Sequence, residues 1–179
     1  MMEKEVKLLD VNVKDMEKLL LEKGAVLFSD ENQLNRILDT SDNKIRQTLP
    51  GYLRIRSSVN LMNGETHTFL TLKKKHFVEG LRVYEETETE ISDINSTIAI
   101  FENLGYKVVN QNEKKRKSFK YQDVRFDLDV WDEEMKLNPY LEIEVPSRER
   151  LEEIIEEFGF DRKKISTKSI RDIVSEQNG

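Results

Sequence analysis

Acidic and basic side chains recur at every second position in many segments of this sequence. EKEVK places Glu3, Glu5 and Lys7 on one face of a strand, and YLEIEV places Glu142 and Glu144 on one face, opposite apolar neighbours. The same spacing relates Arg54 to Arg56, Lys73 to Lys75, Glu86 to Glu88 and Glu90, Lys114 to Arg116, and Asp127 to Asp129. Carboxylates bind hard divalent cations, and Arg and Lys bind phosphate oxygens. A site that joined these groups could process a metal-bound polyphosphate.

The repeated like charges limit where these faces can lie. Two charges two residues apart on a strand are separated by about 7 Å, and each such pair costs roughly 2 kcal/mol at an effective dielectric near 20. In open water, screening removes most of this cost. The charged faces therefore either lie in bulk solvent, as in a purely structural module, or face one another, acidic against basic, around an enclosed space. The apolar faces need covers, and helices can supply them, which favours the enclosed arrangement.

Periodicity and turn signals predict the elements that position these side chains. About eight strands and three or four helices are expected, which is enough strands to close a barrel. The strands are predicted at 2–9, 33–40, 51–60, 65–75, 81–91, 106–121, 124–131 and 140–145, and the helices at 12–24, 92–105, 148–159 and 167–177. Asn63-Gly64 is a strong hairpin signal. Ser92 and Ser147 are the expected N-caps, with Gly105 and Gly159 ending those helices.

Composition excludes several classes of site. The 179 residues carry a net charge of −6, no cysteine and two histidines, so disulfides, thiolate metal sites and His-based zinc sites are not expected. The acidic balance argues against nucleic-acid binding. No signal sequence or long apolar run is present, so a cytoplasmic protein without a membrane partner is expected. In KKRK we expect Lys114 and Arg116 to point inward and Lys115 and Lys117 to be solvated.

The ordered series of motifs resembles the CYTH superfamily, the triphosphate tunnel metalloenzymes. EKEVK matches the ExExK signature and is followed by YLRIR, LTLK, an acidic strand, EKKR, FDLDV and YLEIEV, so the match spans about residues 3–173. The resemblance implies the α+β class: an antiparallel eight-stranded β-barrel, or tunnel, with a charged lumen and helices packed outside. One domain would span 1–179, with the C-terminal helix at about 168–177 as a peripheral element. The tunnel would bind a triphosphate with Mg²⁺ or Mn²⁺.

The resemblance also implies roles for individual residues. The catalytic candidates are Glu3, Glu5, Lys7 and Lys73, and the metal candidates are Glu3, Glu5, Asp127, Asp129, Glu142 and Glu144. The candidates for binding the triphosphate are Lys7, Arg54, Arg56, Lys73, Lys114 and Arg116. Glu86 and Glu88 are further acidic residues of the lumen. Lys168, on the C-terminal helix, is an additional candidate for reaching a phosphate.

Two positions depart from the family pattern. Ile37 stands where many members carry a tyrosine, and Ser169-Ile170 stands where many carry Ser-Tyr. We expect a metal-dependent triphosphatase that hydrolyses inorganic triphosphate, ATP or thiamine triphosphate, acting as a monomer or homodimer. A class IV adenylyl cyclase, which converts ATP to cyclic AMP and pyrophosphate, is the alternative. A non-catalytic protein that binds polyphosphate or nucleotides is a further one.

Overall fold

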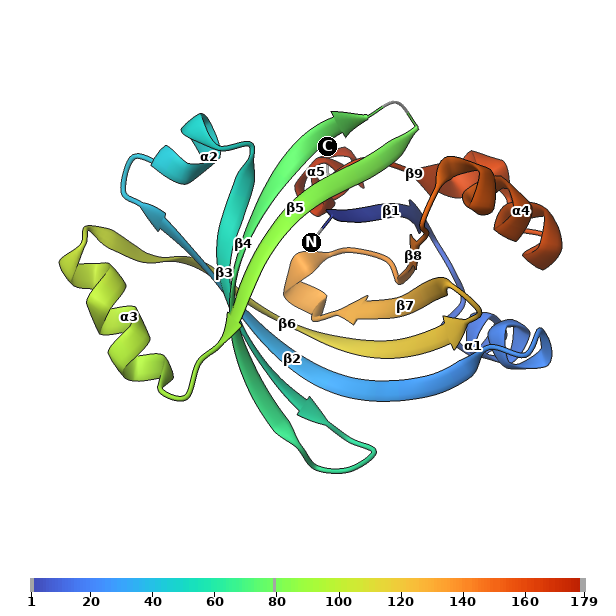
Figure 1. Ribbon diagram of the computed structural model, residues 1–179, viewed down its shortest axis with the longest axis horizontal. Helices are drawn as coiled ribbons and strands as arrows, with labels where there is room; N and C mark the ends of the chain where they lie inside the picture. Colours follow the sequence, from blue (N-terminus) through green and yellow to red (C-terminus); the bar gives the residue numbers. More distant parts are fainter. Residues whose placement is uncertain (1, 79, 178–179) are drawn as a thin grey trace.

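The strands form one antiparallel sheet that closes on itself. The structure is a computed structural model that describes residues 2–78 and 80–177. Its strands are β1 (Met2–Leu8), β2 (Val26–Thr40), β3 (Gly51–Asn60), β4 (Thr66–Val78), β5 (Leu81–Glu90), β6 (Tyr106–Tyr121), β7 (Val124–Trp131), β8 (Tyr140–Glu144) and β9 (Ile165–Ser166). The order is β5-β4-β3-β2-β6-β7-β8-β1-β9, and a further pairing of β5 with β1 completes the barrel. The predicted α+β fold, an eight-stranded antiparallel barrel, is confirmed (Figure 1).

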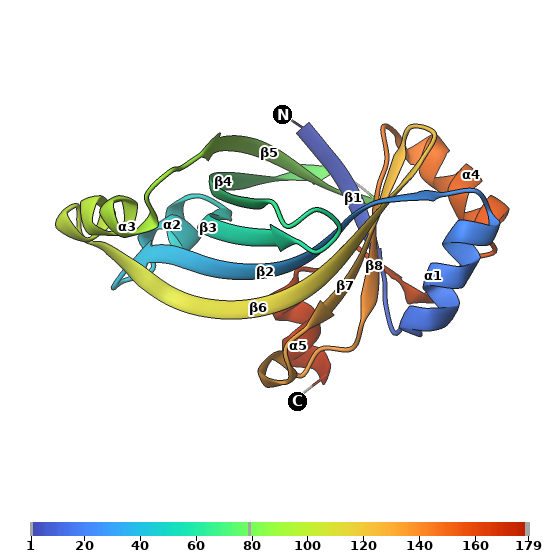
Figure 2. The same ribbon diagram turned by 90° about the horizontal axis from the view of Figure 1, so that it is seen from below.

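Within the described part of the chain, five α-helices and two short 3-10 turns lie outside the barrel. They are α1 (Val13–Glu22), α2 (Lys44–Thr48), α3 (Ile94–Asn103), η1 (Glu133–Met135), α4 (Arg148–Phe158), η2 (Arg162–Lys164) and α5 (Ile170–Gln177). In Figure 2, α1 and α4 lie at one end of the molecule, α2 and α3 lie at the opposite end, and α5 lies beside the chain that follows β7. No helix within the described residues is long and apolar enough to cross a membrane.

The apolar faces of the strands are covered by these helices. The main core packs Leu151, Ile154 and Phe158 of α4 against the outward-facing Leu141 and Ile143 of β8. A second cluster packs α3 over β2, β3 and β4, and a third packs α5 against Trp131, Met135 and Tyr140. Because the apolar side chains of the first two clusters pack against helices outside the barrel, the charged side chains at alternate positions of those strands point into it.

Local signals account for most helix ends. Ser147 caps α4 by accepting a hydrogen bond from the backbone N–H of Arg150 (3.2 Å), and Gly159 follows the helix with φ +68°. The predicted N-cap of α3 was wrong by one residue. Asp93 caps that helix instead of Ser92, because its carboxylate accepts hydrogen bonds from both the N–H and the hydroxyl of Ser96.

The largest difference between a predicted strand and the observed one is in β2. The predicted strand 33–40 is its second half, whereas the strand begins at Val26 and pairs with β6 along its length. Its first half, VLFSDENQ, has no clean alternation, and the ladder has irregularities between Leu27 and Ser29 and between Ile37 and Leu38. The short elements α2 and β9 were not predicted. β9 pairs with the end of β1 that β5 does not reach.

Candidate functional site

A cavity of about 920 Å³ lies inside the barrel and is lined by side chains of all eight barrel strands and of α5. Its cationic lining residues are Lys7, Arg46, Arg54, Arg56, Lys73, Lys75, Arg82, Lys114, Arg116, Arg125 and Arg171. Its acidic lining residues are Glu3, Glu5, Asp39, Glu86, Glu88, Asp127, Glu142, Glu144 and Asp172. The charged strand faces therefore meet around an enclosed space, and the alternative of an open, solvated sheet is ruled out.

Strand register places opposite charges beside one another. Lys7 of β1 is directly opposite Glu142 of β8, and Lys73 of β4 is opposite Glu86 of β5. Arg116 of β6 is opposite Asp129 of β7. In contrast, Lys115 and Lys117 of β6 lie on the outer face, where Lys117 is not simply solvated but binds Glu17 of α1 at 2.7 Å. The alternation along each strand thus selects which charges enter the cavity, and the register pairs them.

Arg116 is the centre of the charge network. Its Nη1 lies 2.6 Å from Asp127, and its Nη2 lies 2.6 Å from both Asp129 and Glu142. Lys114 adds a 2.7 Å contact to Asp129. Burial opposes charge on Asp129, yet the positive charges of Arg116 and Lys114 hold the pKa of its carboxyl below the ordinary value. One guanidinium therefore contacts the carboxylates of three residues on two neighbouring strands.

Lys7 is an almost completely buried ammonium group, with 1% exposure. It contacts Glu142 at 2.8 Å and Glu5 at 3.2 Å. Burial alone would lower the pKa of Lys7, but the charges of Glu142 and Glu5 outweigh burial and raise it. The same environment acts on Glu142, whose pKa is held well below its ordinary value against the effect of burial by Lys7 and Arg116. Both groups are therefore charged.

Glu3 and Glu86 form a carboxyl pair beside Lys73. The Lys73 ammonium lies 2.5 Å from Glu3 and 3.4 Å from Glu86. Burial and a hydrogen bond with Glu3 raise the pKa of Glu86 to about 7. Burial opposes charge on Glu3 as well, but the hydrogen bond with Glu86 and the charge of Lys73 lower its pKa overall. The pair consequently holds one proton on Glu86 at mildly acidic pH.

This pair predicts a pH-dependent stability. The ordinary pKa of Glu86 is 4.5 and its folded value is about 7, so its contribution to stability is complete below the ordinary value and is lost as pH rises through the folded value. Glu86→Gln mimics the protonated form. We expect the melting temperature of the ligand-free variant to exceed that of the wild type increasingly between about pH 5 and pH 8. A difference in melting temperature that is constant across this range would contradict the assignment.

The carboxylates of the cavity are candidate ligands for a divalent metal. Within residues 2–78 and 80–177, no group of three or more His, Asp or Glu side chains is already arranged to hold a metal ion, because most of these carboxylates contact cations. The donor chemistry nevertheless fits Mg²⁺ or Mn²⁺, since all the donors are oxygens. Burial and the charges of Glu3, Asp127 and Glu5 raise the pKa of Glu144. A divalent cation near Glu3, Glu5 and Glu144 would relieve this crowding.

The structure brings nearly all of the predicted site residues to one cavity. Glu3, Glu5, Lys7, Arg54, Arg56, Lys73, Glu86, Glu88, Lys114, Arg116, Asp127, Glu142 and Glu144 line the cavity, and Asp129 lies directly behind them, fully buried. Lys168 does not join them, which corrects the predicted set. Its ammonium lies 2.6 Å from Glu176 of α5 and its side chain is 53% exposed, so this cation is held at the surface. Glu90 also lies outside, beside His67.

Several lining residues were not predicted from the sequence. Arg82 and Tyr84 precede Glu86 at the same two-residue spacing, and Arg125 precedes Asp127 in the same way, so the alternation itself would have found them. Arg82 connects the cavity to the C-terminal segment by donating from Nη1 to the backbone carbonyl of Lys168 (2.9 Å). The helix α5, which was expected to be peripheral, packs against the barrel through Ile173, which is 2% exposed. Other residues of α5 line the cavity.

Comparison with known proteins gives a consistent result. The family model described as CYTH domain matches residues 1–173. The PH1819 protein from Pyrococcus horikoshii OT3 is 24% identical with a TM-score of 0.80, and the match covers 98% of this chain and 99% of that one. A proposed adenylate cyclase from Vibrio parahaemolyticus is 19% identical, with a TM-score of 0.76 and coverage of 97% and 98%.

A proposed adenylyl cyclase from Hippeastrum is 19% identical, with a TM-score of 0.68, and the match covers 97% of this chain and 95% of that one. No match was found among curated proteins. These structural likenesses show a shared fold over nearly the whole of each chain.

Proposed function

We propose, from the premise that this chain belongs to the CYTH domain family, that it is a metal-dependent triphosphatase. The observation that carries the proposal is the cavity itself, where cations and carboxylates from all eight barrel strands converge. Members of this family typically act on triphosphates and depend on a divalent metal. The related Hippeastrum protein is described as having a dominant triphosphatase activity. Together these observations favour hydrolysis over the other reactions of a triphosphate.

The cations of the cavity would bind and orient the triphosphate. Arg54, Arg56, Lys73 and Lys114 come from three different strands and can contact successive phosphoryl groups from different sides. The guanidinium groups supply planar pairs of N–H donors for phosphate oxygens. In a cavity that excludes bulk water, such fixed charges stabilise the negative charge that develops during phosphoryl transfer. Positioning and electrostatics would therefore supply most of the rate enhancement.

Glu3, Glu5 and Glu144 would hold the divalent metal, with Asp127 and Glu142 next to them. When bound, a metal of this kind neutralises phosphate charge and makes a coordinated water more acidic. Glu86, with a pKa of about 7, is suited to accept the proton of the attacking water near neutral pH. The water oxygen bonds to the terminal phosphorus while the bond to the bridging oxygen breaks. Orthophosphate and the shortened phosphate chain leave, and the proton resides on the Glu86 carboxyl.

An adenylyl cyclase would bind its substrate in the same charged cavity but would catalyse attack on a different phosphorus. The ribose 3′-hydroxyl of ATP would attack the α-phosphorus, and pyrophosphate would leave. The names of the Vibrio parahaemolyticus and Hippeastrum proteins keep this reaction as the second candidate. The two reactions differ in their products, so a product assay separates them.

The test is a phosphate-release assay with inorganic triphosphate, ATP and thiamine triphosphate in Mg²⁺ or Mn²⁺, run beside detection of cyclic AMP. We expect orthophosphate from at least one of the three substrates. Cyclic AMP without orthophosphate would establish the cyclase instead, and tight binding without turnover would establish a non-catalytic binding protein.

Removal of the metal gives a separate prediction. Because a divalent metal supplies several kcal/mol of transition-state stabilisation, EDTA should lower the rate of orthophosphate release by about 10²-fold or more. Excess Mg²⁺ or Mn²⁺ added afterwards should restore the rate, whereas Na⁺ at the same ionic strength should not. Full activity in EDTA would show that the cavity carboxylates have another role.

A further inference from the structure

Two arginines of β3, Arg54 and Arg56, differ from four other cations of the cavity in what holds them. Those four each lie within 2.8 Å of a carboxylate oxygen, and they are Lys7, Lys73, Lys114 and Arg116. The nearest carboxylate to Arg54, that of Glu86, is 4.0 Å away. Arg56 forms no ion pair with any of the residues that the structure describes. The β3 arginines therefore keep most of their positive charge uncompensated.

A neutral aromatic ring holds Arg54. The guanidinium carbon of Arg54 lies 5.7 Å from the ring centre of Tyr52, which is within the range of a cation–π contact. Both side chains line the cavity, and Arg54 is only 7% exposed. The contact with the ring occupies none of the N–H donors of the guanidinium, and Nε of Arg54 is buried without an acceptor among the described residues. A ligand that supplies acceptor oxygens would recover the free energy of these unused donors.

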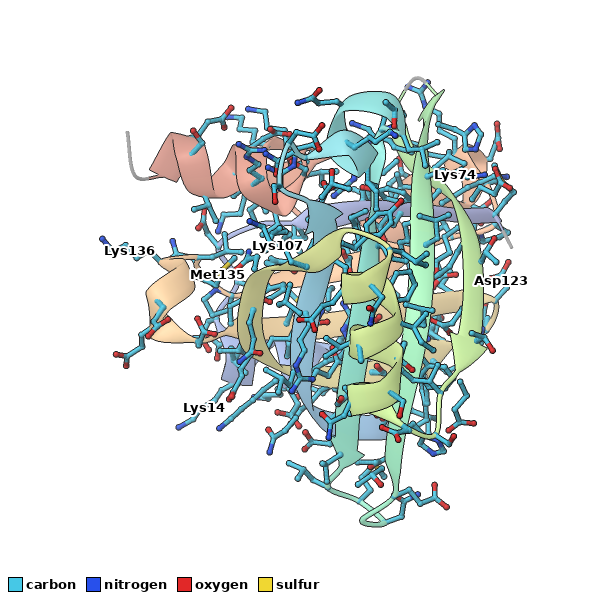
Figure 3. All side chains as sticks on the ribbon, turned by 90° about the vertical axis from the view of Figure 1, so that its left-hand side faces the viewer. Lys14, Lys74, Lys107, Asp123, Met135 and Lys136 are labelled. Atoms are coloured by element: carbon cyan, nitrogen blue, oxygen red, sulfur yellow. The ribbon has the colours of Figure 1, made fainter. Side chains whose placement is uncertain are left out.

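The ring of Tyr52 is itself fixed by a second ring. Its centre lies 6.4 Å from the centre of the Tyr84 ring, with the two planes at 64°, an edge-to-face arrangement. Tyr84 in turn contacts two cations, because Lys73 lies 5.6 Å and Arg82 5.0 Å from its ring centre. The next residue of β4, Lys74, lies on the outside of the barrel (Figure 3) and 3.9 Å from a carboxylate of β5. The two rings therefore set the spacing of neighbouring cations inside the cavity without removing positive charge.

A neutral amide holds Arg56. Nε of Arg56 donates a hydrogen bond of 3.0 Å to Oδ1 of Asn35, the residue directly opposite on β2. Asn35 is 2% exposed and lines the cavity, and its Nδ2 has no hydrogen-bond partner among the described residues. Burial and the positive charges of Arg54 and Arg116 lower the pKa of Arg56 to about 9, so a nearby anion would stabilise its charged form. The amide thus orients this guanidinium and leaves N–H donors of both side chains for a ligand.

We propose that Tyr52 and Asn35 are positioning residues that hold the β3 arginines through neutral contacts and so keep the full charge of both available for the triphosphate. The inference rests on the proposed triphosphate site and adds to it two side chains that orient its cations. A carboxylate in either place would hold an arginine as firmly but would neutralise it. Without the ring of Tyr52, Arg54 would turn toward Glu86, its nearest carboxylate, and the resulting ion pair would compete with the phosphate.

Calorimetric titration with inorganic triphosphate in Mg²⁺ tests the ring at position 52. Tyr52→Leu removes the ring and should weaken binding about tenfold, whereas Tyr52→Phe keeps the ring and should restore the affinity to within about twofold of the wild type. A trifluorinated phenylalanine at this position keeps the shape of the ring but withdraws electrons from its face, so its affinity should fall between those two. In an Arg54→Gln background, Tyr52→Leu should weaken binding by less than about twofold, because the ring acts through Arg54.

Three results would overturn the role of Tyr52. They are an unchanged affinity in Tyr52→Leu, equal losses in Tyr52→Phe and Tyr52→Leu, which would assign the effect to the hydroxyl, and a fluorinated ring that supports binding as well as phenylalanine does. The comparison of the two phenylalanine rings does not depend on how Tyr52→Leu folds, because their shapes are nearly the same.

Asn35→Asp tests the amide, because it replaces a neutral acceptor by a charged one of nearly the same shape. The new carboxylate would form an ion pair with Arg56, so the melting temperature of the ligand-free variant should equal or exceed that of the wild type. The affinity for inorganic triphosphate should nevertheless fall about tenfold or more. Asn32→Asp makes the same change at an exposed position of β2 and should leave the affinity unchanged.

The opposite signs of these two effects separate a positioning role from a structural one. A parallel loss of stability and affinity in Asn35→Asp, or an unchanged affinity, would overturn the role of Asn35. If the wild type binds triphosphate and the variants at positions 35 and 52 bind it equally well, this inference fails and the proposed function still stands. If the wild type binds no triphosphate, the proposed function itself fails.

Discussion

Arg54→Gln is expected to lower kcat/KM for triphosphate hydrolysis by about 10²–10³-fold, the usual effect of removing one preorganised electrostatic group. Arg54 is 7% exposed and lines the cavity. Its contact with Glu86 is long, at 4.0 Å, and its Nε has no hydrogen-bond partner among the described residues. The charge of Arg54 is thus less closely compensated by carboxylates of the protein than the charge of Arg116. A buried cation of this kind is well placed to bind phosphate oxygens.

The stability of this variant separates a ligand-binding role from a structural one. Because the closest carboxylate is distant, removal of the Arg54 charge should leave the free energy of unfolding unchanged or slightly increased. Arg162→Gln is the control, since Arg162 forms ion pairs with Glu152 and Glu156 on the surface of α4, and its activity should match the wild type. Steady-state kinetics and thermal denaturation measure the two effects. A variant that keeps its activity, or loses it only by unfolding, would refute the role of Arg54.

Arg116→Gln, unlike Arg54→Gln, should strongly destabilise the fold. Arg116 contacts Asp127, Asp129 and Glu142 within 2.6 Å. Without the guanidinium, these buried carboxylates repel one another and lose their hydrogen bonds. Breaking a buried ion pair from one side typically costs about 3–5 kcal/mol, so the melting temperature should fall by about 10 °C. Lys115→Gln, at the exposed neighbouring position of β6, should change neither quantity.

Acid titration and metal addition sharpen this second prediction. In the wild type the pKa values of Asp129 and Glu142 lie below their ordinary values of 3.8 and 4.5, so their contribution to stability is present at neutral pH and is lost on acidification. In the variant, protonation of the same carboxyls removes their mutual repulsion and therefore stabilises the folded protein. The gap in melting temperature between the two proteins should therefore narrow as pH falls below about 5. Mg²⁺ should stabilise the variant more than the wild type, and a gap independent of both pH and Mg²⁺ would contradict the electrostatic origin.

Much of the fold could be predicted from alternation alone. In YLEIEV, the apolar Leu141, Ile143 and Val145 are all buried in the core, while Glu142 and Glu144 enter the cavity. The turn at residues 122–123 joins β6 to β7 as predicted. These features are local, because a strand needs only its own two-residue period to assign each side chain to a face. The need to cover the apolar faces favoured an enclosed arrangement of the charged faces, and the resemblance of the motif series to a known family supplied the eight-stranded barrel.

Partners across the cavity could not be predicted in this way. Lys73 contacts Glu3, 70 positions away in the chain, and Arg116 joins β6 to both β7 and β8. Lys168 has the right charge, but Glu176 holds it at the surface, while Arg82 enters the cavity. The alternation of each strand assigned its charges to the inner face, because that period is local. Only the closed sheet decided which charges meet, because the register between distant strands depends on how the whole barrel staggers and closes.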